Sequence, residues 1–140
     1  MEVSLLERTL TQIDHARLTR LMARAKADPR ILPFLEGLDE LLAYSELVEP
    51  ARVPPDVVTM YSRILLSDPA GGAPGKFTVC YPEDAEPAQG FVSVLSPVGT
   101  GLLGLRVGDV AHWRGPGGLA QSARVTTMLF QPEASGDYTL

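Results

Sequence analysis

Glycine and proline are distributed unevenly along this chain of 140 residues, and their distribution divides it into two parts. Only three of the 13 glycines and 12 prolines lie in residues 1–47. Both residue types interrupt regular elements and mark turns. The first part is therefore expected to form long helices, and residues 48–140 are expected to form short strands joined by turns. Prolines at residues 50, 54 and 55 stiffen the linker between the two parts.

Two amphipathic helices are expected in the first part. The first runs from Thr11 to Ala27, because the Thr11 hydroxyl can accept from an amide near Asp14 and apolar residues then recur at helical spacing. The second begins near Pro33, which is tolerated in a first turn since its missing N–H has no partner there. The short connection makes the helices antiparallel neighbours, in a stiff α-helical hairpin that protrudes from the rest of the chain.

The two expected helices carry opposite charges, which favours their pairing. Residues 14–30 hold five basic and two acidic side chains, whereas residues 33–49 hold five acidic side chains and no basic one. A solvated face on each helix explains most of these charges individually, because exposed ion pairs contribute little to stability. At a rise of 1.5 Å per residue, each arm is about 20–25 Å long.

The second part is expected to be a small α+β domain with a mostly antiparallel sheet and one short helix. The helix begins at Pro97 and ends before Gly104, and residues 67–76 form a hairpin loop. Runs of β-branched and aromatic residues indicate the strands. The expected strands are Val57–Leu66, Phe77–Tyr81, Phe91–Leu95, Val110–Arg114 and Leu119–Phe130.

The composition argues against several classes of protein. The net charge is −5, so independent sequence-specific binding to nucleic acid is not expected, because duplex affinity comes mainly from Lys and Arg. Cys80 is the only cysteine, which leaves no internal disulfide or cysteine zinc site and fits a reducing compartment. The chain shows neither a signal-peptide pattern nor an apolar run that spans a bilayer. We therefore expect a cytoplasmic protein without membrane contact.

Motifs that look like catalytic or nucleotide-binding sites fail on their spacing. The stretch Ser67–Phe77 is rich in glycine, but it lacks the Walker A spacing and the hydroxyl after Lys76. Gly99–Gly104 matches GxGxxG, but the next expected strand begins too soon for a βαβ crossover. His15 and His112 have no partner at metal-ligand spacing. We therefore expect no catalytic residue, no cofactor and no metal ion.

Several separated stretches, in order, resemble one protein family. Together they closely resemble the regulators of nucleoside diphosphate kinase (Rnk), relatives of the Gre transcript-cleavage factors of bacterial RNA polymerase. The match covers about residues 10–140, and the Ser-Pro-x-Gly-x-x-Leu-Leu-Gly segment is shared with the Gre factors. The stretches are Pro55–Arg63, Tyr81-Pro82, Ser93–Leu105, Gly108-Asp109, Gln131–Ala134 and Gly136–Tyr138.

The resemblance implies a two-domain protein that binds a much larger enzyme. Residues 1–47 would form a short antiparallel coiled coil, and residues 48–140 an FKBP-like antiparallel sheet domain. Gre factors dock the C-terminal domain on the rim of the polymerase secondary channel and extend the coiled coil toward the active site. By carry-over, Ser96, Pro97 and Val98 are the candidate RNA polymerase-binding residues. The alternative is that this segment only caps and packs the short helix.

The expected tip of the hairpin departs from the Gre pattern. A Gre tip carries paired carboxylates that help to hold a second magnesium ion, whereas this tip holds Arg24, Lys26, Asp28 and Arg30. This departure leads to the hypothesis that the chain binds RNA polymerase and modulates elongation without stimulating transcript cleavage. We expect the protein to be a monomer. Any effect on nucleoside diphosphate kinase would be indirect or through protein contact. Two alternatives stay open: prolyl isomerase activity of the sheet domain, and a true cleavage stimulator that uses Asp28 with Glu36.

Overall fold

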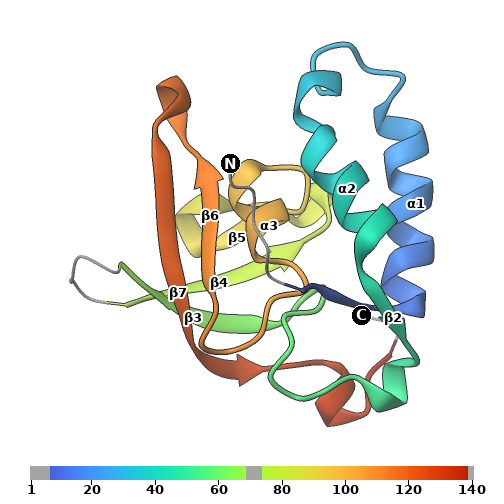
Figure 1. Ribbon diagram of the computed structural model, residues 1–140, viewed down its shortest axis with the longest axis vertical. Coiled ribbons are helices and arrows are strands. Elements are labelled where there is room, and N and C mark those ends of the chain that lie inside the picture. Colours follow the sequence, from blue (N-terminus) through green and yellow to red (C-terminus); the bar gives the residue numbers. More distant parts are fainter. Residues whose placement is uncertain (1–6, 69–73, 139–140) are drawn as a thin grey trace.

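Two helices lie beside a curled five-stranded sheet in the computed structural model, which describes residues 7–68 and 74–138 (Figure 1). The strand order is β5-β4-β3-β7-β6. The pairs β3–β4, β3–β7 and β6–β7 are antiparallel, and β4–β5 is parallel. The expected α+β class with a mostly antiparallel sheet is thus confirmed. The strands are β3 (Arg63–Ser67), β4 (Gly75–Cys80), β5 (Phe91–Ser93), β6 (Val110–Arg114) and β7 (Ala120–Phe130).

The helices are α1 (Gln12–Ala25), α2 (Glu36–Tyr44) and α3 (Pro97–Leu102). The predicted start of α1 is confirmed, because the Thr11 hydroxyl accepts a hydrogen bond of 3.0 Å from the Asp14 amide. The second helix is only nine residues long, shorter than expected. Pro33 lies in a separate 3-10 turn ahead of α2, and the chain after Tyr44 turns into a strand.

A two-stranded parallel ladder closes the base of the helical pair. Strand β1 (Thr9–Thr11) pairs with β2 (Glu46–Val48). The Thr9 amide also donates to the carbonyl of Gly104, at 3.0 Å. The ladder therefore ties both ends of the helical segment to the chain that follows α3. No part of the sequence analysis predicted these strands.

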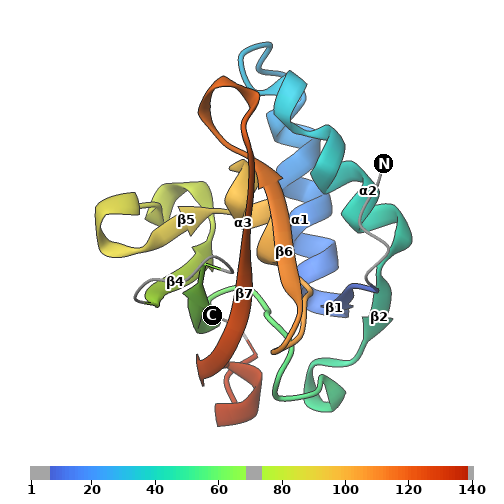
Figure 2. The same cartoon turned by 60° about the vertical axis from the view of Figure 1, so that its left-hand side comes forward.

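Both long helices share one hydrophobic core with the sheet. Leu18 of α1 and Leu38 of α2 are fully buried in the same cluster as Ile64 and Val79 of the sheet. Figure 2 shows α1, α2 and α3 on one side of the strands. The expected finger therefore does not stand clear of the sheet along this buried face. The division into two domains, residues 1–47 and 48–140, stays a prediction.

The expected strand at Val57–Leu66 is wrong in its first half. Strand β3 begins only at Arg63, because the chain turns before it. The Thr59 amide donates to the Ser62 hydroxyl at 2.9 Å, and Tyr61 adopts a φ of 66°, which no strand allows. The β-branched residues at the start of this segment are buried in the core. Burial, rather than pairing in a strand, therefore explains why the segment is rich in them.

Part of one prediction lies outside the described residues. The expected hairpin loop at residues 67–76 joins β3 to β4, but its residues 69–73 are not described, and the glycine-rich phosphate-loop look-alike falls on the same segment. Within the described ranges, no helix combines the length and the apolar character needed to cross a bilayer.

Candidate functional site

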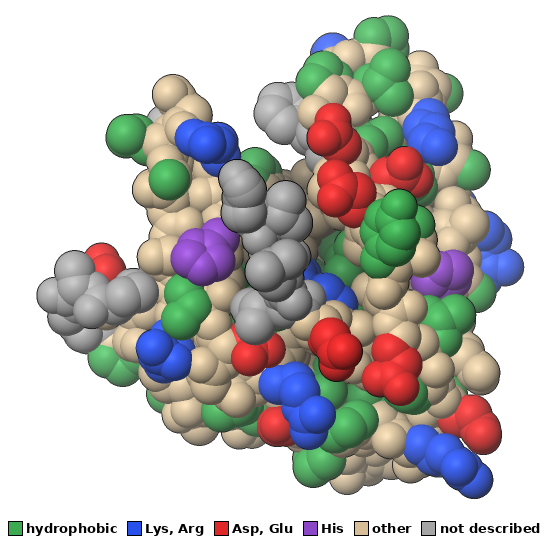
Figure 3. Space-filling model, viewed as in Figure 1, with side chains coloured by type: hydrophobic (Ala, Val, Ile, Leu, Met, Phe, Trp, Pro, Cys, Tyr) green, Lys and Arg blue, Asp and Glu red, His purple; other side chains and the backbone are tan. Residues whose placement is uncertain are grey.

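A groove lies between α2 and the hairpin of β6 and β7, where Figure 3 shows the surface hollowed. Residues of α3 also line it. Its volume is about 1510 Å³. Pockets that hold small molecules span about 300–1,000 Å³, so this groove can take a segment of a partner protein. The helical wall is formed by Glu36, Gly37, Glu40, Leu41 and Tyr44, and the sheet wall by His112, Trp113, Arg114 and Gly115.

The α3 part of the groove lining is rigid because this helix packs directly on backbone. A Cβ atom on Gly99 would lie 2.1 Å from the carbonyl oxygen of Ser93, so only glycine fits at this position. The Thr100 hydroxyl donates to the carbonyl of Val94 at 2.6 Å. These contacts hold α3 in one position between the strands and α2.

The structure gives different roles to the three candidate docking residues. The Ser96 hydroxyl accepts from the Gly99 amide at 3.2 Å and donates to the Ser93 carbonyl at 2.6 Å, so it caps α3. Val98 packs against the core. Pro97 is exposed and lines the groove. Of the three side chains, Pro97 alone is both exposed and part of the groove lining, while the docking role itself stays a prediction.

Arg8 contacts the C-terminal end of α3. The sequence analysis did not single out this residue. Its Nη1 donates to the carbonyl oxygens of Leu103, at 2.7 Å, and Thr100, at 3.1 Å. A cation at the carbonyl end of a helix is favourable because it satisfies acceptors that the helix leaves open. Burial lowers the pKa of this guanidinium from its ordinary value. A basic residue just ahead of β1 is too common a signal to reveal this contact.

The groove carries more negative than positive charge. Its lining includes four glutamates and two arginines. Arg8 donates to backbone carbonyls, as described, and Arg114 donates to the carbonyl of Gly118 at 2.8 Å. Tyr44, which is 85% exposed, and Trp113 add apolar surface to the same lining. The groove therefore suits a segment that presents basic and apolar side chains together.

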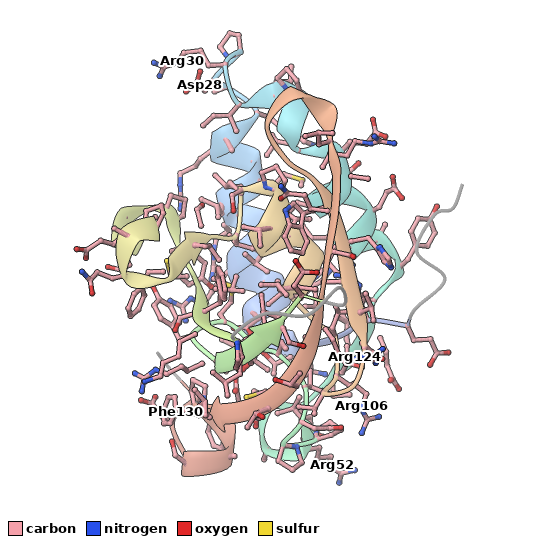
Figure 4. The ribbon with its side chains drawn as sticks, turned by 90° about the vertical axis from the view of Figure 1, so that its left-hand side faces the viewer. Asp28, Arg30, Arg52, Arg106, Arg124 and Phe130 are labelled. Atoms are coloured by element: carbon pink, nitrogen blue, oxygen red, sulfur yellow. The ribbon has the colours of Figure 1, made fainter. Side chains whose placement is uncertain are left out.

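The predicted tip residues lie in the last turn of α1 and in the loop that follows it. This loop is at the end of the helical pair that is farthest from β2 (Figures 1 and 4). Arg30 binds Asp28 with two side-chain hydrogen bonds, of 3.1 and 3.0 Å, and its amide donates to the same carboxylate at 3.0 Å. These contacts lower the pKa of Asp28 below its ordinary value. Arg24 and Lys26 are exposed beside this pair. In the described part of the chain, no group of three potential ligand side chains could hold a metal ion.

A buried carboxylate fixes α1 to the sheet. Asp14 lies in the first turn of α1, and its carboxylate accepts from the amide of Met60 at 3.1 Å. Burial is the main reason that the pKa of Asp14 rises to about 7. Glu133 lies near it and accepts from the Thr59 hydroxyl at 2.7 Å, and burial raises its pKa as well.

Comparison with known proteins identifies relatives over most of the chain. Residues 53–128 match the family described as transcription elongation factor, GreA/GreB, C-terminal. The regulator of nucleoside diphosphate kinase of Escherichia coli strain K12 is 41% identical over 109 residues, which cover 78% of this chain and 80% of that protein. Transcription elongation factor GreA of Flavobacterium johnsoniae is 31% identical over 81 residues, 58% of this chain and about half of that protein, 51%.

A solved structure agrees with these relatives. The prokaryotic transcription elongation factor GreA/GreB from Nitrosomonas europaea superposes with a TM-score of 0.74 and 31% identity, over 89% of this chain and 100% of that chain. The resemblance inferred from the separated sequence stretches is thus confirmed. The chain belongs to the GreA/GreB family, with the regulators of nucleoside diphosphate kinase among its relatives.

Proposed function

We propose that the chain is a non-enzymatic protein that binds bacterial RNA polymerase at its secondary channel and modulates elongation without stimulating transcript cleavage. Its relatives are named as a regulator and as elongation factors. The sheet part, which contains the family match, would dock on the polymerase as an FKBP-like module. The helical part would enter the channel.

Pro97 and the groove beside it support the docking step. Pro97 is exposed on a helix whose cap and packing are already satisfied by Ser96 and Gly99. Its ring is therefore free to contact a partner without loss of the structure of α3. The acidic wall of α2 and the apolar surface of Trp113 would bind a polymerase segment with basic and apolar side chains, because such a pairing steers the partner and buries apolar area.

The contact between Asp28 and Arg30 is the observation that best supports the proposal that the chain does not stimulate cleavage. Two-metal chemistry needs carboxylate oxygens that are free to bind the second ion. Both oxygens of Asp28 accept from Arg30, and this residue is the one acidic side chain of residues 24–32. A tip with this arrangement would enter the channel and bring no ligand set to the catalytic metal.

An effect on nucleoside diphosphate kinase would follow indirectly from this function. Altered elongation would change how much kinase is made, whereas direct contact with the kinase would be a separate protein interaction. The family resemblance supports the first route, because it points to transcription.

A transcript-cleavage assay with stalled elongation complexes tests the proposal. The purified chain alone is expected to leave cleavage at the background rate. Added to a GreA factor, it is expected to reduce GreA-stimulated cleavage as its concentration rises, since both would occupy one channel. Strong stimulation by the chain alone would overturn the proposal, and so would full GreA activity in the presence of saturating chain.

A further inference from the structure

A small pocket beside α1 gathers three arginines. It has a volume of about 210 Å³. One wall is α1, and the other is the chain that follows β4. The sequence analysis assigned Arg17 and Arg20 only to the general basic charge of the first helix, and Arg24 also to the hairpin tip. The lining residues are Arg17, Arg20, Leu21, Arg24, Tyr81 and Glu83.

The spacing of the arginines places them on one face of the helix. Positions 17, 20 and 24 lie within about 60° of one another around the α1 axis. Like charges three and four residues apart repel and destabilise a helix. Neither Arg20 nor Arg24 forms an ion pair with a carboxylate among the residues described. An anion bound between these side chains would relieve that repulsion.

Arg17 and Tyr81 provide a fixed base for the pocket. The Arg17 guanidinium lies over the Tyr81 ring, 4.7 Å from its centroid, in a cation–π contact. Tyr81 is 7% exposed, and its hydroxyl oxygen is buried without a hydrogen-bond partner among the described residues. A buried hydroxyl without a partner is costly. Burial raises the pKa of Tyr81 to about 12.

Phosphate is the anion that this set of donors fits best. Guanidinium groups bind phosphate oxygens in pairs of parallel hydrogen bonds. Glu83 is the one carboxylate that lines the pocket. It repels a free anion but accepts from hydroxyl groups, so it favours a phosphate joined to a sugar over a phosphate alone.

The size of the pocket limits how much of a ligand it encloses. Sites that bury a drug-sized molecule measure about 300–1,000 Å³, and this pocket is smaller. It can hold phosphate and sugar groups while the base stays in solvent. The Tyr81 ring offers no stacking surface for a base, because Arg17 covers one face and the Tyr61 ring packs beside it with centroids 5.8 Å apart.

We propose that this pocket binds the phosphate and ribose groups of a nucleoside diphosphate or triphosphate. The arginines hold the phosphate oxygens, and Glu83 accepts from a ribose hydroxyl. Selectivity among bases is therefore weak. Binding requires no polymerase, so this proposal stands or falls independently of the docking function.

Calorimetric titration of the full chain at low ionic strength tests the proposal. The probes are GDP, ADP, pyrophosphate and a single-stranded RNA hexamer. GDP and ADP are expected to bind with similar affinities, more tightly than pyrophosphate. The double variant Arg20→Ala/Arg24→Ala is expected to weaken GDP binding by at least about tenfold, because two charge-assisted contacts are lost. Alanine is the best helix former, so α1 remains folded in this variant.

Two further variants separate the pocket from general charge. Arg52→Ala/Arg63→Ala removes the same net charge from exposed residues that do not line the pocket, and it is expected to leave GDP affinity within about twofold, since screened surface charge acts weakly. Glu83→Gln is expected to tighten pyrophosphate binding, and to lower the ratio of GDP affinity to pyrophosphate affinity below that of the wild type. Each of four results would overturn the proposal: no GDP binding, an equal loss in both double variants, tighter binding of the RNA hexamer than of GDP, or equal affinities for GDP and pyrophosphate.

Discussion

The carboxylate of Asp14 in α1 accepts a hydrogen bond of 3.1 Å from the backbone amide of Met60, in the turn before β3. This contact joins residues 46 positions apart in the sequence. Both residues are buried, with exposed fractions of 4% and 1%. The position of the helical pair on the sheet therefore depends in part on an ionisable group within the core.

The buried state of Asp14 predicts that stability falls as the pH rises. Burial raises the pKa of this carboxyl from 3.8 to about 7 in the folded protein. Below pH 3.8 the folded and unfolded chains both keep the Asp14 proton, and the stabilisation from burying the neutral carboxyl is fully present. Between pH 3.8 and about 7 the unfolded chain releases this proton and the folded chain keeps it, so the free energy of unfolding falls by up to about 4 kcal/mol. Glu133 acts in the same direction, because its pKa is also raised.

Asp14→Asn is expected to remove most of this fall and to be more stable than the wild type at pH 8, since the amide oxygen still accepts from Met60. Urea unfolding across this pH range measures the effect. Asp39→Asn, at an exposed position of α2, is the matched control and is expected to keep the wild-type slope. If both variants kept that slope, Asp14 would not be the group responsible.

Replacement of Arg8 is expected to loosen α3. Arg8→Met keeps the aliphatic stem but leaves the carbonyls of Thr100 and Leu103 without the donor that they now have. The expected loss is about 2–3 kcal/mol of unfolding free energy, because these are charge-assisted bonds to partly buried acceptors. Arg52→Met, at an exposed position, should stay within about 0.5 kcal/mol of the wild type. Chemical denaturation compares the two, and equal stabilities would show that Arg8 does not hold α3.

Gly99 and Gly37 are expected to respond differently to alanine. The new Cβ at residue 99 would meet backbone, with the Ser93 oxygen at 2.1 Å, so Gly99→Ala must displace α3 and should cost about 1–3 kcal/mol. At residue 37 the nearest atom is the Thr100 methyl group, at 3.2 Å. Gly37→Ala should stay within about 1 kcal/mol, because alanine also favours α2. Thermal unfolding distinguishes these cases, and a larger loss at residue 37 would contradict this packing.

The tip contact predicts an unusual titration for Asp28. Arg30 holds the pKa of this carboxyl below its ordinary value of 3.8. Carboxyl carbon shifts followed by NMR should report this lowered pKa in the wild type and a return toward the ordinary value in Arg30→Ala. Lys26→Ala, in the same exposed segment, is expected to leave the titration unchanged. A normal pKa in the wild type would mean that the carboxylate is free to bind a metal ion.

Local signals predicted the elements that local interactions determine. The start of α1 followed from Thr11 and its reach to the Asp14 amide. The short helix α3 followed from Pro97 and the glycines after it, and β6 was predicted with its exact bounds. Each of these features depends on residues within a few positions of one another, which is the range that capping and periodicity report.

Features that depend on distant contacts were missed. The β1–β2 ladder pairs Thr9 with Glu46 through three-residue strands, which are too short to show an alternating pattern. The roles of Arg8 and Asp14 have no local signal in the sequence, because their partners lie 95 and 46 positions away. The groove combines α2, α3 and β6, so no single stretch of sequence reveals it. Pro97 was singled out as a docking residue only through the family resemblance.

Binding of the full chain to core RNA polymerase, measured at low salt by co-elution and by titration, tests the central claim most directly. The account predicts that the wild type binds and that Pro97→Arg weakens binding by at least about tenfold, because a charge replaces an apolar contact at the groove. Pro87→Arg is the matched control, since Pro87 is also exposed and also begins a short helical turn, and it should bind like the wild type. Absence of wild-type binding, or equal binding by both variants, would contradict the account.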